Sequence, residues 1–176
     1  SSSSSNCKKC QKGTYSTAMG ASVALTCNAC PPGKKSNVLG ANSSQTCSDC
    51  EEGKASGTGA IVCLDCPHGR KSLAGAPVCS LCGTGTVQVG DDAKSFTCND
   101  CDIGKIAQAG DDTCQSCVAG RYQLNTGQGS CQPCEAGTWS DTVGSSLLSN
   151  CKRCQKGTYS TAIGASVILT CNACPP

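Results

Sequence analysis

The sequence predicts a small disulfide-rich fold, in which tandem short β-hairpin modules stack into an elongated rod with little regular secondary structure. Cysteine supplies 20 of the 176 residues, a share typical of disulfide scaffolds. The chain holds one Phe, one Trp, three Tyr and one Met, which are too few large apolar side chains for the core expected at this length. We therefore expect disulfides to stabilise the fold, and an oxidising extracellular or cell-surface location to preserve them.

The cysteines form ten C-x-x-C pairs that open every 16 to 20 residues. A glycine stands three residues after each of the first nine pairs: Gly13, Gly33, Gly53, Gly69, Gly85, Gly104, Gly120, Gly137 and Gly157. A glycine fixed at this place suits a turn with positive φ, or a close approach of the backbone to a disulfide. A second glycine often precedes the run to the next cysteine, as in GASVALTC. Each interval is therefore predicted to be an irregular β-hairpin closed by cysteines.

Four of the five aromatic residues occupy one position of this module, five residues after the second cysteine of a pair. They are Tyr15, Tyr122, Trp139 and Tyr159. We expect the side chain at this position to pack against the next disulfide. Because other modules place Lys, Ala, Val or Ile there, the aromatic ring is optional and the disulfide is the main staple. For closed loops of this size the chain-entropy model gives roughly 3 kcal/mol per bridge.

A longer period lies above the short one. Residues 1–32 and 145–176 are identical at 27 of 32 positions. Near-identity after eight diverged modules indicates an internal duplication. We therefore expect residues 1–144 to form one super-repeat of eight C-x-x-C modules, and residues 145–176 to begin the next one.

The uniform signature of the intervals favours one disulfide pattern, in which the second cysteine of each pair bonds the first cysteine of the next. This pattern joins Cys10–Cys27, Cys30–Cys47, Cys50–Cys63, Cys66–Cys79, Cys82–Cys98, Cys101–Cys114, Cys117–Cys131, Cys134–Cys151 and Cys154–Cys171. Cys7 and Cys174 would then bond to cysteines of adjacent repeats. The alternative, Cys7 with Cys27 and Cys10 with Cys30, would make odd and even intervals differ, and it stays open because sequence alone does not prove a pairing.

Other chemistries find weaker support in the sequence. The C-x-x-C spacing also suits zinc ribbons, but the long Ser, Thr and Gly stretches and a single histidine favour a secreted scaffold. His68 has no nucleophile set apart from the repeat pattern and is expected in an exposed turn. Asp91, Asp92, Asp111 and Asp112 lie in turns without the ligand series of a calcium loop. We expect no enzyme activity, no cofactor and no catalytic or metal site.

Charge and hydropathy narrow the partners further. The formal net charge is +2, with 15% charged residues spread along the chain, so no basic patch predicts nucleic-acid binding. No apolar run within this segment reaches the roughly 18 residues that span a bilayer. Asn42 begins the sequon Asn42-Ser43-Ser44 in a polar loop, which makes it a candidate glycosylation site.

The C-x-x-C pairs separated by G-T-Y-S and a Gly-Ala/Ser segment resemble the cysteine-rich repeats of ephrin-receptor-like and tumour-necrosis-factor-receptor-like ectodomains, and of many protist surface proteins. The stretch CQKGTYSTAMGASVALTCNACPPGKKS carries the resemblance most clearly. The likeness implies a scaffold of disulfide-tied hairpins stacked end to end, and it specifies no ligand. The motifs GTGTVQ at residues 83–88 and DIGKIA at 102–107 keep the glycine but lose the aromatic residue and the serine.

The fidelity of the 144-residue repeat favours a structural function. A contact that recurs unchanged without closing a ring propagates into a filament. Protist flagellar hairs, the mastigonemes, and surface coats use cysteine-rich repeats of this sort. The sequence therefore predicts a self-associating extracellular filament or coat subunit, with the flagellar surface as one location. The alternative is a monomeric stalk, surface antigen or receptor-like ectodomain that displays or binds a ligand.

Overall fold

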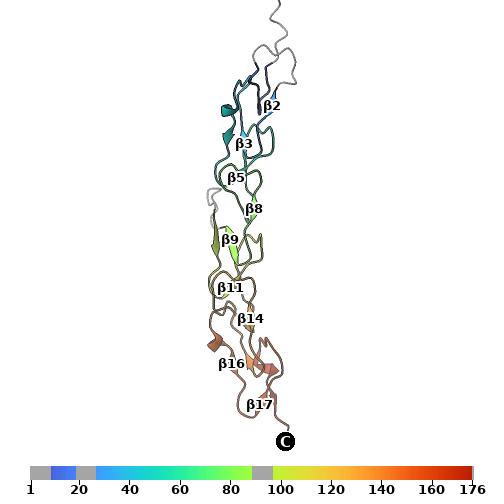
Figure 1. Ribbon diagram of the computed structural model, residues 1–176. Coiled ribbons are helices and arrows are strands. Elements are labelled where there is room, and N and C mark those ends of the chain that lie inside the picture. Colours follow the sequence, from blue (N-terminus) through green and yellow to red (C-terminus); the bar gives the residue numbers. More distant parts are fainter. Residues whose placement is uncertain (1–8, 19–26, 89–96, 176) are drawn as a thin grey trace, which may run out of the picture. The chain divides into compact units, whose positions relative to one another are not determined.

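The computed structural model describes residues 9–18, 27–88 and 97–175 (Figure 1). Within these residues the regular structure consists of antiparallel strand pairs and three short 3-10 turns: η3 Ser44–Thr46, η4 Leu148–Asn150 and η5 Ile168–Thr170. No α-helix occurs in this part of the chain. The predicted small disulfide-rich fold of tandem β-hairpins is confirmed.

The chain divides into two compact units, residues 1–80 with 90–96, and residues 81–89 with 97–176. The first unit contains hairpins 1 to 4, the fourth of which ends at the unit boundary: β1 Thr14–Tyr15 with β2 Asn28–Ala29, β3 Lys34–Lys35 with β4 Ser48–Asp49, β5 Lys54–Ala55 with β6 Leu64–Asp65, and β7 Arg70–Lys71 with β8 Ser80–Leu81. The second unit contains hairpins 5 to 9: β9 Thr86–Gln88 with β10 Cys98–Asp100, β11 Lys105–Ile106 with β12 Gln115–Ser116, β13 Arg121–Tyr122 with β14 Gln132–Pro133, β15 Thr138–Trp139 with β16 Lys152–Arg153, and β17 Thr158–Tyr159 with β18 Asn172–Ala173.

Each hairpin starts at a glycine turn that the C-x-x-C spacing places. In hairpin 6 the Lys105 N–H donates to the Asp102 carbonyl at 3.1 Å, and Gly104 lies between them with φ of +76°. Positive φ at the third residue of a turn is the position that glycine fills without steric cost. The Gly104 carbonyl then accepts from the Cys117 N–H at 2.9 Å, which brings the closing strand alongside. The expected positive φ is therefore confirmed.

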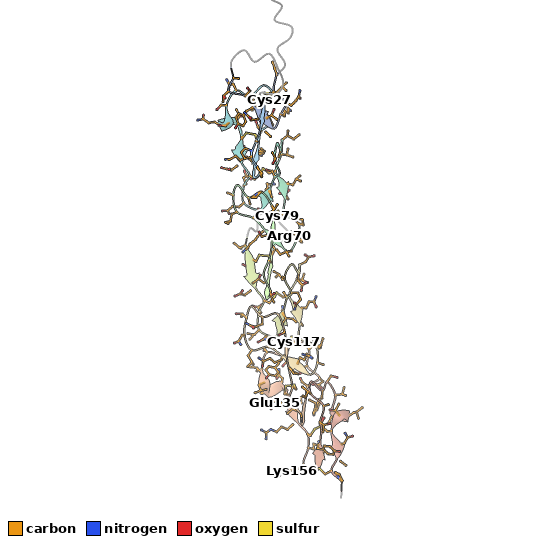
Figure 2. The ribbon with its side chains drawn as sticks, turned by 45° about the vertical axis from the view of Figure 1, so that its right-hand side comes forward. Cys27, Arg70, Cys79, Cys117, Glu135 and Lys156 are labelled. Carbon is orange, nitrogen blue, oxygen red and sulfur yellow. A yellow bond between two sulfur atoms is a disulfide. The ribbon has the colours of Figure 1, made fainter. Side chains whose placement is uncertain are left out.

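The residue after the glycine stabilises the turn through contacts that depend on its identity. A threonine turns its hydroxyl back to the first carbonyl of the turn, as Thr138 does to Glu135 at 2.6 Å. An arginine instead reaches across the hairpin, and Arg70 donates to the Cys79 carbonyl at 3.0 Å (Figure 2). Both solutions stabilise the same two-residue strand pair without an apolar core.

Successive hairpins within a unit are joined by a repeated set of backbone hydrogen bonds. Between hairpins 7 and 8 this set comprises Gly120 N–H to Ser140 C=O at 2.7 Å, Gln123 N–H to Ser145 C=O at 3.0 Å, and Gly144 N–H to Cys117 C=O at 2.7 Å. The same three bonds join hairpins 1 and 2, 2 and 3, and 6 and 7, and two of the three join hairpins 3 and 4, 5 and 6, and 8 and 9. Because the bonds involve only backbone groups, hairpins of different sequence stack in the same way.

Burial is concentrated on sulfur and on the third residue after each turn glycine. The side chains of Cys30, Cys50, Cys82, Cys101, Cys117 and Cys134 are at most 1% exposed. Ser36, Ser56, Ser72, Ser140 and Ser160 share the third position and are also buried. Where the serine is absent, Gln123 is buried at this position in hairpin 7, and Ala107 in hairpin 6 packs with Val87 and Cys101. The core is thus a series of disulfides, each covered by the side chain at this third position.

Candidate functional site

Each hairpin is closed by a disulfide. In the structure each closing disulfide joins the second cysteine of one pair to the first cysteine of the next: Cys10–Cys27, Cys30–Cys47, Cys50–Cys63, Cys66–Cys79, Cys82–Cys98, Cys101–Cys114, Cys117–Cys131, Cys134–Cys151 and Cys154–Cys171. The Cα–Cα distances are 5.6 to 5.8 Å, within the usual range for disulfides. Cys174 is unpaired and exposed, and Cys7 lies outside the described residues.

The turn glycine also lies against the hairpin two places further on. A Cβ atom added at Gly120 would come closer than 3.0 Å to the carbonyl group of Gly164, a separation that real Cβ atoms essentially never show. The same relation holds for Gly13 with Gly59, Gly33 with Gly75, Gly85 with Gly127, and Gly104 with Gly144. The expected close approach to a disulfide is therefore wrong: the close approach is to the backbone of a second glycine. Each of these hairpins contacts its second neighbour as well as its first.

The glycine turn of hairpins 8 and 9 has the same conformation but no such neighbour. Gly137 and Gly157 have φ of +79° and +82°, and a Cβ atom at either position would meet no other atom within 4 Å. The conformational requirement for glycine and the packing requirement are thus separated within one chain. Sequence reasoning missed the packing requirement, although the paired glycines of each interval were its signal.

The side chains at the aromatic position also differ in burial between hairpin 7 and hairpin 9. The ring of Tyr122 is buried, with 8% of its surface exposed, while Tyr159 is 44% exposed. Tyr122 and Trp139 form parallel bridges to Ser145 and Ala165 of the following hairpin. The aromatic residue is therefore covered by the next hairpin. We had expected it to pack against a disulfide only.

Charged groups pair across strands and remain exposed. Lys34 and Lys54 contact Asp49 and Asp65 of the facing strand. Lys152 lies 3.0 Å from Asp141 and 4.7 Å from the ring centre of Trp139. The hydrogen bond from Lys152 lowers the pKa of Asp141 below its ordinary value of 3.8.

The remaining candidate residues lie apart from one another. His68 is exposed in the turn before β7, and Asn42 is exposed in the loop before η3. Asp111 accepts a hydrogen bond from the Gln108 N–H at 2.7 Å, so it closes a turn, while Asp91 and Asp92 lie outside the described residues. Within residues 9–18, 27–88 and 97–175, no group of three His, Cys, Asp or Glu side chains could hold a metal ion.

A shallow cavity of about 410 Å³ lies on hairpin 8. Its lining residues are Glu135, Thr138, Leu148, Ser149, Cys151 and Arg153. Cys151 is held in a disulfide, so the cavity contains no free thiol nucleophile. The candidate functional feature is therefore not a pocket. It is the set of backbone N–H and carbonyl groups through which each hairpin binds the next one, which we call the stacking face.

Comparison with known families agrees with this architecture. Residues 104–151 match the family model described as tyrosine-protein kinase ephrin type A/B receptor-like. This part of the chain is similar to the ephrin-receptor-like cysteine-rich family. No curated protein matches the chain.

The ephrin-receptor-like segment begins at the turn glycine of hairpin 6 and ends at the closing cysteine of hairpin 8. Within it the three interhairpin hydrogen bonds are complete, as they also are between hairpins 1 and 2 and between hairpins 2 and 3. The family is a non-catalytic, extracellular type of ectodomain. None of the helical turns in the described ranges is long and apolar enough to cross a membrane.

Proposed function

We propose that this chain is a structural repeat region of an extracellular filament or surface coat, of the mastigoneme type found on flagellar surfaces. The observation that supports the proposal is the backbone contact between hairpins, which uses the same groups at successive hairpins within each unit. A contact of this kind, repeated without closure, builds linear assemblies. Residues 1–144 supply one super-repeat, and residues 145–176 begin the next with 27 of 32 residues unchanged.

The proposal includes the pairing of the cysteines. The nine bridges from Cys10–Cys27 to Cys154–Cys171 keep every hairpin equivalent, and Cys7 and Cys174 bond to cysteines in adjacent repeats. Digestion of the unreduced protein followed by mass spectrometry tests this pairing. A peptide that links Cys7 to Cys27 would contradict it.

A glycan on Asn42 belongs to the same proposal. Asn42 is exposed and lies two residues before the 3-10 turn η3, so an attached sugar would project into solvent. Treatment of the native protein with an amidase that releases N-glycans should convert Asn42 to aspartate, a mass change of one unit on its peptide. An unmodified Asn42 peptide before treatment would refute glycosylation.

A second candidate function rests on the family match. The ephrin-receptor-like segment at residues 104–151 favours a receptor-like ectodomain that displays or binds a ligand. In that case the exposed loops, which carry Leu147, Leu148 and Leu169 at more than half exposure, would be the variable surface. The two functions differ in whether the native protein associates with itself.

Electron microscopy of the native, unreduced protein separates the two candidates. The filament proposal expects fibres with an axial repeat set by the 144-residue block. Isolated particles that do not associate at any tested concentration would contradict it and favour the ectodomain function. Reduction should dissolve the fibres, because each hairpin loses its closing bridge.

A further inference from the structure

The charged residues are spread along the chain, but the two signs are segregated. The first four C-x-x-C modules, residues 7–78, contain eight Lys or Arg and four Asp or Glu, a net charge of +4. The next four modules, residues 79–150, contain three Lys or Arg and eight Asp or Glu, a net charge of −5. Each segment is 72 residues long, and the three charged residues within 151–176 are all cations. The net charge therefore changes sign with every half of the 144-residue block.

One cross-strand position shows why the acidic charge stays uncompensated in the second segment. In hairpin 2 Lys34 faces Asp49 across the strand pair and forms an ion pair with it. In hairpin 5 the equivalent aspartate is Asp100, but the residue that faces it is Thr86. Asp100 is exposed and has no ion pair among the described residues.

Two lysines of the basic segment share one module position and have no acidic partner. Lys35 and Lys71 each stand two residues after a turn glycine, in β3 and β7, and both are exposed. Neither forms an ion pair within the described ranges. Their hairpins, 2 and 4, contact each other where Gly33 lies against the Gly75 carbonyl. This contact fixes the interval between the two lysines' hairpins.

Two carboxylates of the acidic segment recur at the same interval. Asp102 and Glu135 each directly follow the second cysteine of a pair, in hairpins 6 and 8, and both are exposed. The structure gives neither of them an ion pair with another described residue. Hairpins 6 and 8 contact each other where Gly104 lies against the Gly144 carbonyl, as hairpins 2 and 4 do through Gly33 and Gly75. Two free cations and two free anions are thus matched in spacing, four hairpins apart along the chain.

We propose that a second copy of this chain binds alongside the first, in the same direction and offset by four hairpins. Hairpins 1 to 4 of one copy then face hairpins 5 to 8 of the other. In this register Lys35 of one copy forms an ion pair with Asp102 of the other, and Lys71 with Glu135. This inference deepens the proposed filament function and rests on it.

Charge complementarity selects a second copy as the occupant. The basic and acidic segments have equal length, nearly opposite net charge and matched intervals between their free charged groups, and they belong to one chain. Lys35 and Asp102 are exposed although hairpins 2 and 6 have neighbours on both sides within their units. Their exposure is therefore a property of the module position, which recurs along the chain.

The direction of the second copy follows from the filament function. In a same-direction offset, the acidic segment of one copy and the basic segment of the other stay free, so further copies add through the same contact. Exposed ion pairs are individually weak, and complementary charge mainly selects the partner and its register. The association should therefore be sensitive to ionic strength.

Sedimentation of the 176-residue chain at two salt concentrations gives the first test. The variant with Cys7→Ser and Cys174→Ser serves as the parent, because it removes disulfide-linked oligomers from the measurement. Raising the salt from about 0.01 M to about 1 M shortens the Debye length from about 30 Å to about 3 Å. The dissociation constant should rise roughly tenfold or more. Association that does not respond to salt, or a parent that stays monomeric at millimolar concentration in low salt, would overturn the proposal.

Charge reversal with rescue tests the register. Lys35→Glu should raise the low-salt dissociation constant roughly fivefold, because an attraction becomes a repulsion. Adding Asp102→Lys restores opposite signs across the contact and should return the dissociation constant to the parent's value. Adding Asp112→Lys instead is the matched control, because Asp112 is an exposed carboxylate of the same hairpin with no ion pair among the described residues. Equal rescue by the two additions would overturn the register.

The outcomes separate this inference from the proposed function. Native fibres that are unchanged by salt and by Lys35→Glu would refute the lateral contact and leave the filament function standing. A purified chain that shows the reversal and the rescue, together with native material that forms no fibres, would support the contact and refute the filament function. A chain that stays monomeric but binds a sulfated polysaccharide through Lys35 and Lys71 would assign the basic segment to a different partner and overturn the proposal.

Discussion

Hairpins 7 and 9 belong to one unit and share a glycine turn, a two-residue strand pair and a closing disulfide. They differ in what surrounds them. Hairpin 7 is covered by hairpin 8 and touched by hairpin 9, so that Tyr122 is buried and a Cβ at Gly120 would clash. Hairpin 9 has no covering hairpin among the described residues, so that Tyr159 is exposed and Gly157 lies open. The local sequence specifies the hairpin, and its place in the stack determines what each residue contributes.

The largest expected effect comes from removing the closing disulfide of hairpin 7 in one variant and that of hairpin 9 in another. Replacing Cys117 and Cys131 by serine should cost about 4 kcal/mol, because the unfolded chain regains roughly 3 kcal/mol of conformational entropy and the contacts of hairpin 7 with hairpins 6 and 8 are weakened. Replacing Cys154 and Cys171 should cost about 3 kcal/mol. Guanidinium unfolding followed by the fluorescence of Trp139, the only tryptophan, measures both values. Equal losses of unfolding free energy in the two variants would show that contacts with neighbouring hairpins add nothing to the stabilisation by the disulfide.

An alanine at the turn glycine separates backbone conformation from packing. Gly104 and Gly157 have φ of +76° and +82°, so the left-handed conformation costs both variants a similar 1 to 2 kcal/mol. Gly104→Ala also places Cβ against the Gly144 carbonyl and should lose about 2 kcal/mol more, as in overpacked cores. The free energy of unfolding of each variant is the measurement. If Gly157→Ala proves the more destabilising, the packing argument fails.

Truncation of the aromatic residue should follow its burial. Tyr122→Ala should destabilise the second unit by about 3 kcal/mol, which is the lower range for buried aromatic residues. Tyr159→Ala should cost less than about 1 kcal/mol, because the ring is already exposed. Thermal unfolding of both variants, with the disulfides intact, tests the difference. A loss at Tyr159 as large as that at Tyr122 would mean that hairpin 9 is covered in solution.

The smallest effect concerns the ion pair of hairpin 8, which hairpin 9 replaces by Thr161 and Asn172. Because the folded state lowers the pKa of Asp141 below 3.8, the pair stabilises the fold above that pH. This contribution is lost as the pH falls through the lower, folded-state pKa. Titration of Asp141 by NMR should show the lowered pKa, and Lys152→Met should raise it toward the ordinary value, while the backbone hydrogen bond to the carboxylate remains. Added salt should weaken the shift because the pair is exposed.

The sequence was sufficient to predict the hairpins because their determinants are local. The Gly104 turn, the two-residue strands and the cysteine spacing all lie within one interval, and the ephrin-receptor-like resemblance was confirmed for residues 104–151. The contact between Gly104 and Gly144 joins hairpins two apart. The two glycines of each interval are visible in the sequence, but the sequence within one interval does not show which other hairpin they contact. For the same reason the burial of Ser140 was not predicted. The disulfide pairing, the super-repeat and the glycan at Asn42 stay predictions.

The closing bridges also determine how far the chain can be stretched. A force applied along the repeats passes from Cys30 across the bridge to Cys47 and then through three residues to Cys50. This path extends to about 16 Å, since the bridge spans 5.6 Å between Cα atoms and each extended residue adds about 3.4 Å. After reduction the same interval could extend to about 70 Å. The hairpin loops therefore carry no tension while the bridges are intact, so loops of different length can be joined in series without weakening the chain.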